Sequence, residues 1–82
     1  MITIYSKDYC PYCTKAKNLL QNLGLDFTEI DVMNDEKLQE ECRAKSGRKT
    51  IPQIFIGSVH IGGYDDLYAK HKSGELAALL ER

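Results

Sequence analysis

The residues Cys10-Pro11-Tyr12-Cys13 stand at the junction between a strand-like stretch and a helical stretch of the chain. Before them, residues 2–5 (Ile-Thr-Ile-Tyr) alternate in character and are all β-branched or aromatic, which predicts a strand. After them a helix is expected from Pro11, because proline at the first helical position gives up no needed hydrogen bond. Its apolar residues recur on one face (Ala16, Leu19, Leu20 and Leu23), and Gly24 can end the helix in a left-handed conformation.

Glycine and proline divide the rest of the chain into short elements. Residues 27–32 predict a second strand, and Asn34 is expected to cap a second helix that runs to Ser46, where Gly47 ends it. The later elements are predicted as strands over 52–56 and 59–61, joined by a Gly57-Ser58 turn and ended by Gly62-Gly63, and as helices over 65–72 and 75–82. A βαβ crossover makes the first two strands parallel, and a hairpin adds antiparallel strands. We therefore expect an α/β fold of order βαβαββαα, with a four-stranded mixed sheet flanked by helices.

Length and composition limit the classes of function. The 82 residues make a single domain, residues 1–82, and a hydrophobic fraction of 43% is enough for a core. Eleven basic and twelve acidic residues give a net charge of −1, which lacks the basic footprint of a nucleic-acid-binding protein. No apolar run approaches the roughly 18–20 residues of a membrane span, and the start at Met1 lacks the pattern of a secretory signal. We expect a cytoplasmic protein that binds neither nucleic acid nor membranes.

The two cysteines of the C-x-x-C segment are three residues apart, so their sulfur atoms can meet on one face of a helix. Cys10 is expected at the helix start, where free backbone N–H groups and the helix dipole stabilise a thiolate, and Lys7 adds positive charge nearby. Environments of this kind lower a thiol pKa from about 8.5 to roughly 3.5–7.5. Cys13 lies inside the first turn and should be less exposed and less acidic. The pattern predicts a nucleophilic Cys10 and a resolving Cys13.

A zinc site is the alternative interpretation of a C-x-x-C pair. Tetrahedral zinc needs four ligands, and the remaining candidates Cys42, His60 and His71 show no paired spacing. Three cysteines are also an odd number, which makes a poor disulfide framework. The redox interpretation is therefore preferred, and no metal site is predicted. Cys42 has no motif around it and is expected to be a small buried apolar residue.

Three motifs, in order along the chain, resemble those of the glutaredoxin family. Cys10-Pro11-Tyr12-Cys13 is similar to the active site of its dithiol class, and Thr50-Ile51-Pro52 is similar to its Thr-Val-Pro loop. Gly62-Gly63-Tyr64-Asp65-Asp66 is similar to its Gly-Gly-x-Asp/Ser-Asp turn. The resemblance covers essentially the whole chain and points to the bacterial type 3 members. It implies a thioredoxin-like fold and a glutathione site.

The resemblance assigns glutathione contacts to these motifs and to two lysines that would hold the glycyl carboxylate. Pro52 is implied to be cis and to face the cysteines, with Ile51 offering its backbone to the cysteinyl part of glutathione. Asp65 and Asp66 are implied to receive the γ-glutamyl end at a helix start. Arg48 is interpreted as a bystander. The implied contact set is Lys7, Tyr12, Lys49, Thr50, Ile51, Pro52, Gly63, Tyr64, Asp65 and Asp66. The alternatives are a simple strand-start proline, aspartates that only cap a helix, and solvated surface lysines.

The resemblance implies a glutathione-dependent thiol–disulfide oxidoreductase that reduces protein disulfides and glutathione mixed disulfides through the Cys10/Cys13 dithiol. Glutathione would be a co-substrate, no cofactor would be tightly bound, and a monomer would act on disulfide-containing or glutathionylated proteins. Two alternatives stay open. A thioredoxin-type reductant recharged by a flavin reductase would not need the turn at residues 62–66, and an iron–sulfur or zinc module built on Cys10 is disfavoured by Pro11.

Overall fold

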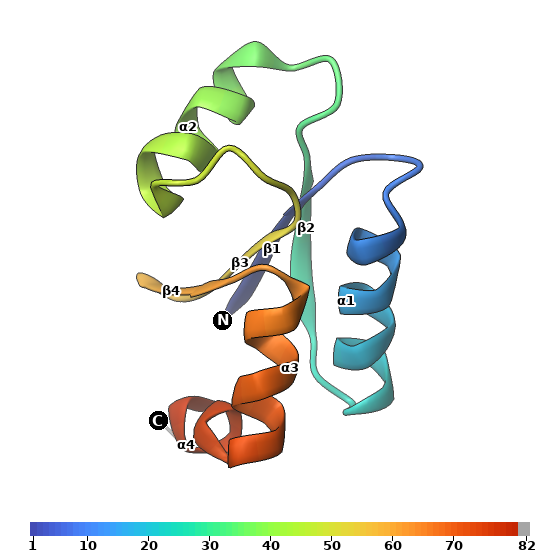
Figure 1. The fold of residues 1–82 in the computed structure, drawn as a ribbon, viewed down its shortest axis with the longest axis vertical. Helices are drawn as coiled ribbons and strands as arrows, with labels where there is room; N and C mark the ends of the chain where they lie inside the picture. The colour runs from blue at the N-terminus through green and yellow to red at the C-terminus, as the bar shows by residue number, and fades with distance from the viewer. Residues whose placement is uncertain (81–82) are drawn as a thin grey trace.

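The protein folds as a single mixed sheet with helices on both faces (Figure 1). The computed structural model describes residues 1–80. The elements are β1 (Ile2–Ser6), α1 (Pro11–Asn22), β2 (Phe27–Asp31), α2 (Glu36–Ser46), β3 (Gln53–Ile56), β4 (Val59–Gly62), α3 (Tyr64–Ser73) and α4 (Glu75–Leu80). The four strands lie in the order β2-β1-β3-β4. Strand β1 is parallel to β2 and antiparallel to β3, and β3 is antiparallel to β4. The predicted element order and mixed sheet are confirmed.

The larger core lies between the sheet and the helices α1, α3 and α4. Of the apolar face predicted for the first helix, Ala16 and Leu20 are fully buried and Leu19 is partly buried. Leu23 is exposed, because the helix ends at Asn22 and Leu23 is its C-cap. The cluster consists of Ile2, Ile4, Ala16, Leu20, Ile54, Ile61, Leu67 and Leu76. Because burying one such aliphatic side chain contributes about 1.5–3 kcal/mol, this cluster fixes α1 and α3 against the sheet.

The smaller core lies on the other face of the sheet, under α2. It contains Tyr5, Val32, Cys42 and Phe55, with Leu38 packed at its edge. The rings of Tyr5 and Phe55 meet edge to face with centroids 5.7 Å apart. Cys42 is 2% exposed, as expected for a cysteine that serves as a small apolar residue. Helix α2 therefore rests on few apolar contacts.

A polar cluster of Ser6, Lys17 and Glu29, here called the polar anchor, joins α1 to strands β1 and β2. Ser6, which is fully buried at the end of β1, donates a hydrogen bond to Glu29 in β2. Lys17 of α1 approaches the same carboxylate, with Nζ 2.9 Å from Oε2. The hydrogen bonds from Ser6 and then Lys17 hold the pKa of Glu29 below its ordinary value. The anchor favours an ionised Glu29 in the folded protein.

Asn34 does not cap α2, contrary to the sequence prediction. Asp35 is the cap, since its backbone is extended and its Oδ1 accepts the N–H of Leu38 at 3.0 Å. Asn34 has a φ of 62°, a left-handed conformation that asparagine tolerates, so it belongs to the preceding turn.

Other element boundaries differ slightly from the predicted ones. Strand β3 begins at Gln53 rather than Pro52, because proline has no N–H for the ladder. Strand β4 extends through Gly62, with an irregular register opposite Ile54 and Phe55. Helix α3 is one residue longer at each end than predicted, and the last two residues of the helix predicted over 75–82 lie outside the described residues.

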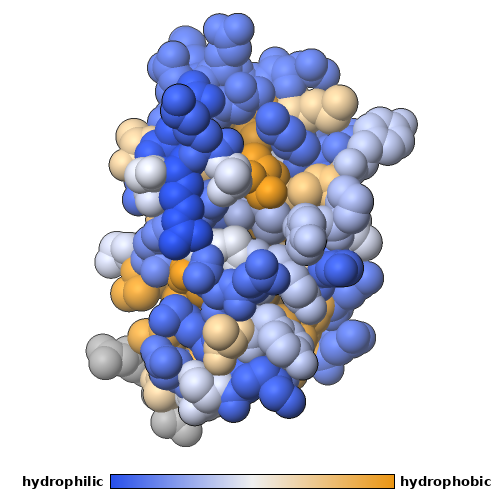
Figure 2. All heavy atoms as spheres, in the orientation of Figure 1, coloured by the Kyte–Doolittle hydropathy of each residue, from blue (hydrophilic) through white to orange (hydrophobic). Residues whose placement is uncertain are grey.

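The surface in the orientation of Figure 1 is mostly hydrophilic. Figure 2 shows the apolar side chains of this face in small separate areas. Among residues 1–80, no helix has both the length and the apolar character needed to cross a bilayer.

Candidate active site

Cys10 occupies the N-cap of α1, as predicted. Its backbone is extended, with φ −108° and ψ 105°, and its Sγ accepts the backbone N–H of Cys13 at 3.2 Å. The first turn of α1 contains no acidic residue. The sulfur therefore lies at the positive end of the helix dipole and is held there by the N–H of Cys13.

Cys13 lies one turn further on and is 1% exposed. Burial, followed by its hydrogen bond with Cys10, raises the pKa of Cys13 to about 12. Cys13 consequently remains a thiol at neutral pH, which agrees with the prediction that it is the less acidic of the two cysteines. Both cysteines are free thiols, and the difference in burial separates an accessible Cys10 from a protected Cys13.

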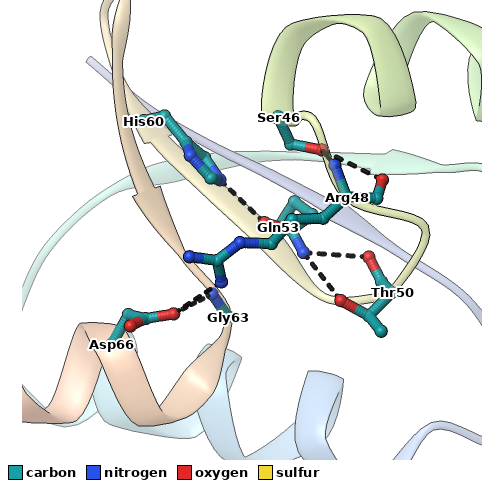
Figure 3. Close-up of polar contacts among 7 residues, drawn as sticks. All are labelled: Ser46, Arg48, Thr50, Gln53, His60, Gly63 and Asp66. Atoms are coloured by element: carbon teal, nitrogen blue, oxygen red, sulfur yellow. Dashed lines mark hydrogen bonds and ion pairs between the residues drawn. The ribbon is translucent and has the colours of Figure 1, made fainter.

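The segment before β3 forms a wall of the site. The Ile51–Pro52 peptide bond is cis, as the resemblance implied, and the carbonyl oxygen of Ile51 lies 3.9 Å from the Sγ of Cys10. Gln53, which is fully buried, donates from Nε2 to the carbonyl and to the hydroxyl of Thr50, each at 3.0 Å (Figure 3). This amide therefore fixes the backbone beside the nucleophile.

His60 supports the same wall from β4. Its Nε2 lies 2.8 Å from Oε1 of Gln53, and because the Gln53 amide nitrogen donates to Thr50, the histidine donates to the amide oxygen. Burial and then the charge of Arg48 lower the pKa of His60, so its neutral form is favoured. Neither Gln53 nor His60 was predicted to have a role in the site. No local motif marks them, because their contact depends on the pairing of β3 with β4.

The start of α3 forms the opposite wall. Asp66 accepts the backbone N–H of Gly63 at 3.0 Å, so it caps its own helix. The Nη1 of Arg48 lies 2.8 Å from the same oxygen, Oδ2 of Asp66. The hydrogen bonds from Arg48 and from Gly63 hold the pKa of Asp66 below its ordinary value. Arg48 thus lines the site, and its prediction as a bystander is wrong.

Between these walls lies a cavity of about 210 Å³. Its lining residues are Tyr12, Arg48, Thr50, Ile51, Pro52, Gly63, Tyr64, Asp65 and Asp66. All except Arg48 belong to the predicted contact set. Three segments that are distant in sequence, at the starts of α1 and α3 and before β3, therefore form one concave surface, and Figure 1 shows these segments facing one another.

The two predicted lysines meet in a second, smaller hollow. Its volume is about 20 Å³, and its lining includes Lys7, Lys49 and the shared residues Thr50 and Ile51. Gln39 and Arg43 of α2 also line it and were not predicted. Because the hollow carries several cationic groups, it suits a carboxylate.

Aromatic side chains border the cavity on the side of α1 and α3. The ring centroids of Tyr12 and Tyr64 are 6.3 Å apart, and those of Tyr64 and Tyr68 are 6.1 Å apart. The Nζ of Lys15 lies 5.1 Å from the centre of the Tyr12 ring. Tyr64 therefore lines the cavity and packs between the rings of Tyr12 in α1 and Tyr68 in α3.

The three remaining candidate metal ligands do not gather around Cys10 and Cys13 as a metal site would require. Cys42 is in the smaller core, His60 supports the Thr50 backbone, and His71 lies near the end of α3 beside the Tyr68 ring. Within residues 1–80, no group of three or more histidine, cysteine or acidic side chains is arranged to hold a metal ion.

Comparisons with known proteins agree with the fold and the motifs. The Glutaredoxin family model matches residues 2–61. Glutaredoxin 3 of Escherichia coli (strain K12) is 48% identical over 80 residues, which cover 98% of this chain and 96% of the relative. The solution structure of glutaredoxin from Brucella melitensis is 52% identical with a TM-score of 0.84, and covers 96% of this chain and 86% of that chain. The crystal structure of a buckwheat glutaredoxin–glutathione complex is 34% identical with a TM-score of 0.89, and covers 98% of this chain and 76% of that one.

Proposed function

This chain belongs to the glutaredoxin family, and on that premise we propose that it is a glutathione-dependent thiol–disulfide oxidoreductase. The observation that carries the proposal is the pair of thiols at the start of α1, one accessible and one buried, beside the backbone of Ile51. The buckwheat relative forms a complex with glutathione. The proposed site for the same tripeptide is the cavity lined by Ile51, whose carbonyl oxygen lies 3.9 Å from the Cys10 sulfur.

The chemistry is thiol–disulfide exchange in two steps. The Cys10 thiolate attacks the glutathione sulfur of a mixed disulfide, the old S–S bond breaks, and the released protein thiolate takes a proton. A glutathione thiolate then attacks the glutathione sulfur held on Cys10, which yields oxidised glutathione and restores the Cys10 thiolate. For a disulfide within a protein, Cys13 resolves the mixed disulfide with Cys10 after losing its proton, and two glutathione molecules later reduce the Cys10–Cys13 disulfide.

The cavity supports a specific placement of glutathione. The backbone of Ile51 would pair with the cysteinyl unit, as an added strand does. The free N–H groups at the start of α3 would hold the α-carboxylate of the γ-glutamyl unit, and Asp66 would hold its ammonium. Lys7 and Lys49 would hold the glycyl carboxylate in the small hollow.

We infer a physiological setting from the sequence. Three cysteines without a disulfide framework support work in a reducing compartment, the cytoplasm, where the protein would pass electrons from glutathione to disulfide-containing and glutathionylated proteins. A monomer with no tightly bound cofactor is sufficient for this chemistry, because both thiols and the proposed glutathione contacts come from one chain.

The test is a coupled assay with glutathione, its reductase and a glutathione mixed disulfide, alongside an assay of a protein disulfide. Cys10→Ser should abolish both activities, whereas Cys13→Ser should keep the first and lose the second, since glutathione can replace the resolving thiol only in the first. Cys42→Ala, which removes the third cysteine from the smaller core, is the control and should keep both. Efficient reduction by a flavin-dependent thioredoxin reductase, with no turnover by glutathione, would contradict the proposal.

A further inference from the structure

An ion pair already occupies the cavity wall where the γ-glutamyl unit is proposed to bind. The guanidinium of Arg48 lies 2.8 Å from Oδ2 of Asp66, and Figure 3 shows it extending across the space between α2 and the start of α3. Oδ2 also accepts the N–H of Gly63, while Oδ1 accepts no hydrogen bond from any residue among positions 1–80. Asp66 therefore already has a cationic partner in the position where a ligand ammonium would need it.

Arg48 is held by its backbone, while its side chain is free to change partner. The hydroxyl of Ser46 accepts the backbone N–H of Arg48 at 3.1 Å and donates its proton to the carbonyl oxygen of Cys42 in α2 at 2.7 Å. Gly47, with φ 70°, turns the chain at the end of α2. The side chains of Arg48 and Asp66 are 47% and 44% exposed, so water can solvate both groups during an exchange.

We propose that Arg48 is a specificity-determining residue that exchanges ion pairs with the γ-glutamyl unit; this inference rests on the proposed function. The ligand ammonium takes the place of the guanidinium at Asp66, and the guanidinium turns to the ligand α-carboxylate. One internal ion pair becomes two ion pairs between protein and ligand. Every charge keeps a partner only when the ligand carries both an ammonium and a carboxylate.

This exchange predicts that each of two ligands with only one of the two charged groups binds the wild-type protein more weakly than the complete γ-glutamyl unit. A ligand with the ammonium alone must displace Arg48 from Asp66 without offering it a carboxylate. A ligand with the carboxylate alone can pair with Arg48 only if the guanidinium leaves Asp66, and Asp66 is then without a cationic partner. In both cases one charge is left to water, and because the site is partly exposed, each loss should change affinity about two- to fivefold.

The experiment compares three small mixed disulfides with 2-mercaptoethanol: that of glutathione, that of its 4-aminobutyryl analogue without the α-carboxylate, and that of its glutaryl analogue without the ammonium. KM is measured for the wild-type protein and for Arg48→Met, Arg48→Lys and Lys37→Met. Lys37 is an exposed cation elsewhere on α2 and serves as the control. In Arg48→Met, KM should fall about two- to fivefold for the 4-aminobutyryl substrate and rise by a similar factor for the glutaryl substrate.

The opposite signs separate ion-pair exchange from a structural effect. Arg48→Lys keeps the charge and should restore the wild-type order of the two analogues, and Lys37→Met should leave that order unchanged. Equal changes for all three substrates in Arg48→Met, or no change, would overturn the inference while leaving the proposed function intact. If the wild-type protein does not turn over the glutathione mixed disulfide, the proposed function fails and the inference fails with it.

Discussion

Replacing Gly62 with alanine should damage the glutathione site through a steric clash. Gly62 has a φ of 122°, a conformation that side-chain-bearing residues rarely adopt. An ideal Cβ at this position would lie 2.6 Å from Cγ and 2.8 Å from Cβ of Asp66, where real Cβ atoms essentially never approach. Because the Cβ of Asp66 does not move when the side chain rotates, the backbone at Gly62 or at the start of α3 must shift, and the Asp66 carboxylate must leave the N–H of Gly63 and Arg48.

The structure sets the size of the effect. The backbone conformation alone should cost about 1–3 kcal/mol with a Cβ present. Loss of the Asp66 cap on α3 should add about 1 kcal/mol. For a domain of this length, each 1 kcal/mol lowers Tm by roughly 4–8 °C. The displaced carboxylate should also raise KM for a glutathione mixed disulfide by several-fold to about tenfold, since one charge-assisted hydrogen bond is lost and the 44% exposure of Asp66 places it at the weak end of the range for such bonds.

Gly74→Ala provides the matched control. Gly74 also has a positive φ, 86°, but a Cβ there meets no atom within 4 Å, and it lies at the other end of α3. The control therefore has backbone strain without the clash and should keep the wild-type KM. Urea unfolding and the coupled assay measure the two effects. Equal losses of stability in both variants, together with an unchanged KM in Gly62→Ala, would refute the steric argument.

Three further outcomes are expected. Asp66→Ala should raise KM for a glutathione mixed disulfide severalfold but leave alkylation of Cys10 by a small reagent at the wild-type rate, because the thiol belongs to α1; an equal slowing of alkylation would show that Asp66 shapes the thiol. Hydrogen bonds from Ser6 and from Lys17 lower the pKa of Glu29 in the folded protein. The contribution of Glu29 to the free energy of unfolding should therefore be present in full above its unfolded pKa of about 4.3, and it should be lost as the pH falls through its lower pKa in the folded protein. Urea unfolding should therefore show a weaker acid dependence in Glu29→Gln than in the wild type, and identical slopes would contradict this. Leu20→Ala should lower the free energy of unfolding by about 2–5 kcal/mol, since Leu20 is fully buried. A loss below about 1 kcal/mol would contradict this and would show that neighbouring core side chains fill the space left by Leu20.

Local signals predicted most of the elements. The apolar spacing in α1 and the alternation in β1 each depend on residues within a few positions, so they are visible in the sequence. Asn34 shows the limit of such reasoning. Asn34 and Asp35 are both good N-cap residues by type, and only the path of the chain into α2 selects Asp35 and leaves Asn34 in the turn.

The site shows the same division. The sequence by itself determined the two thiols and their order, because the first N–H groups and the positive dipole end of any helix lie at its start, beside Cys10 and one turn before Cys13. Only the tertiary structure decided that Arg48 meets Asp66 and that His60 and Gln53 support Thr50. These partners lie on separate elements, and their distances depend on how α2, α3 and the β3–β4 hairpin pack around the sheet. Residue type and spacing along the chain carry no information about such contacts, whereas the shared core that orients these elements creates them.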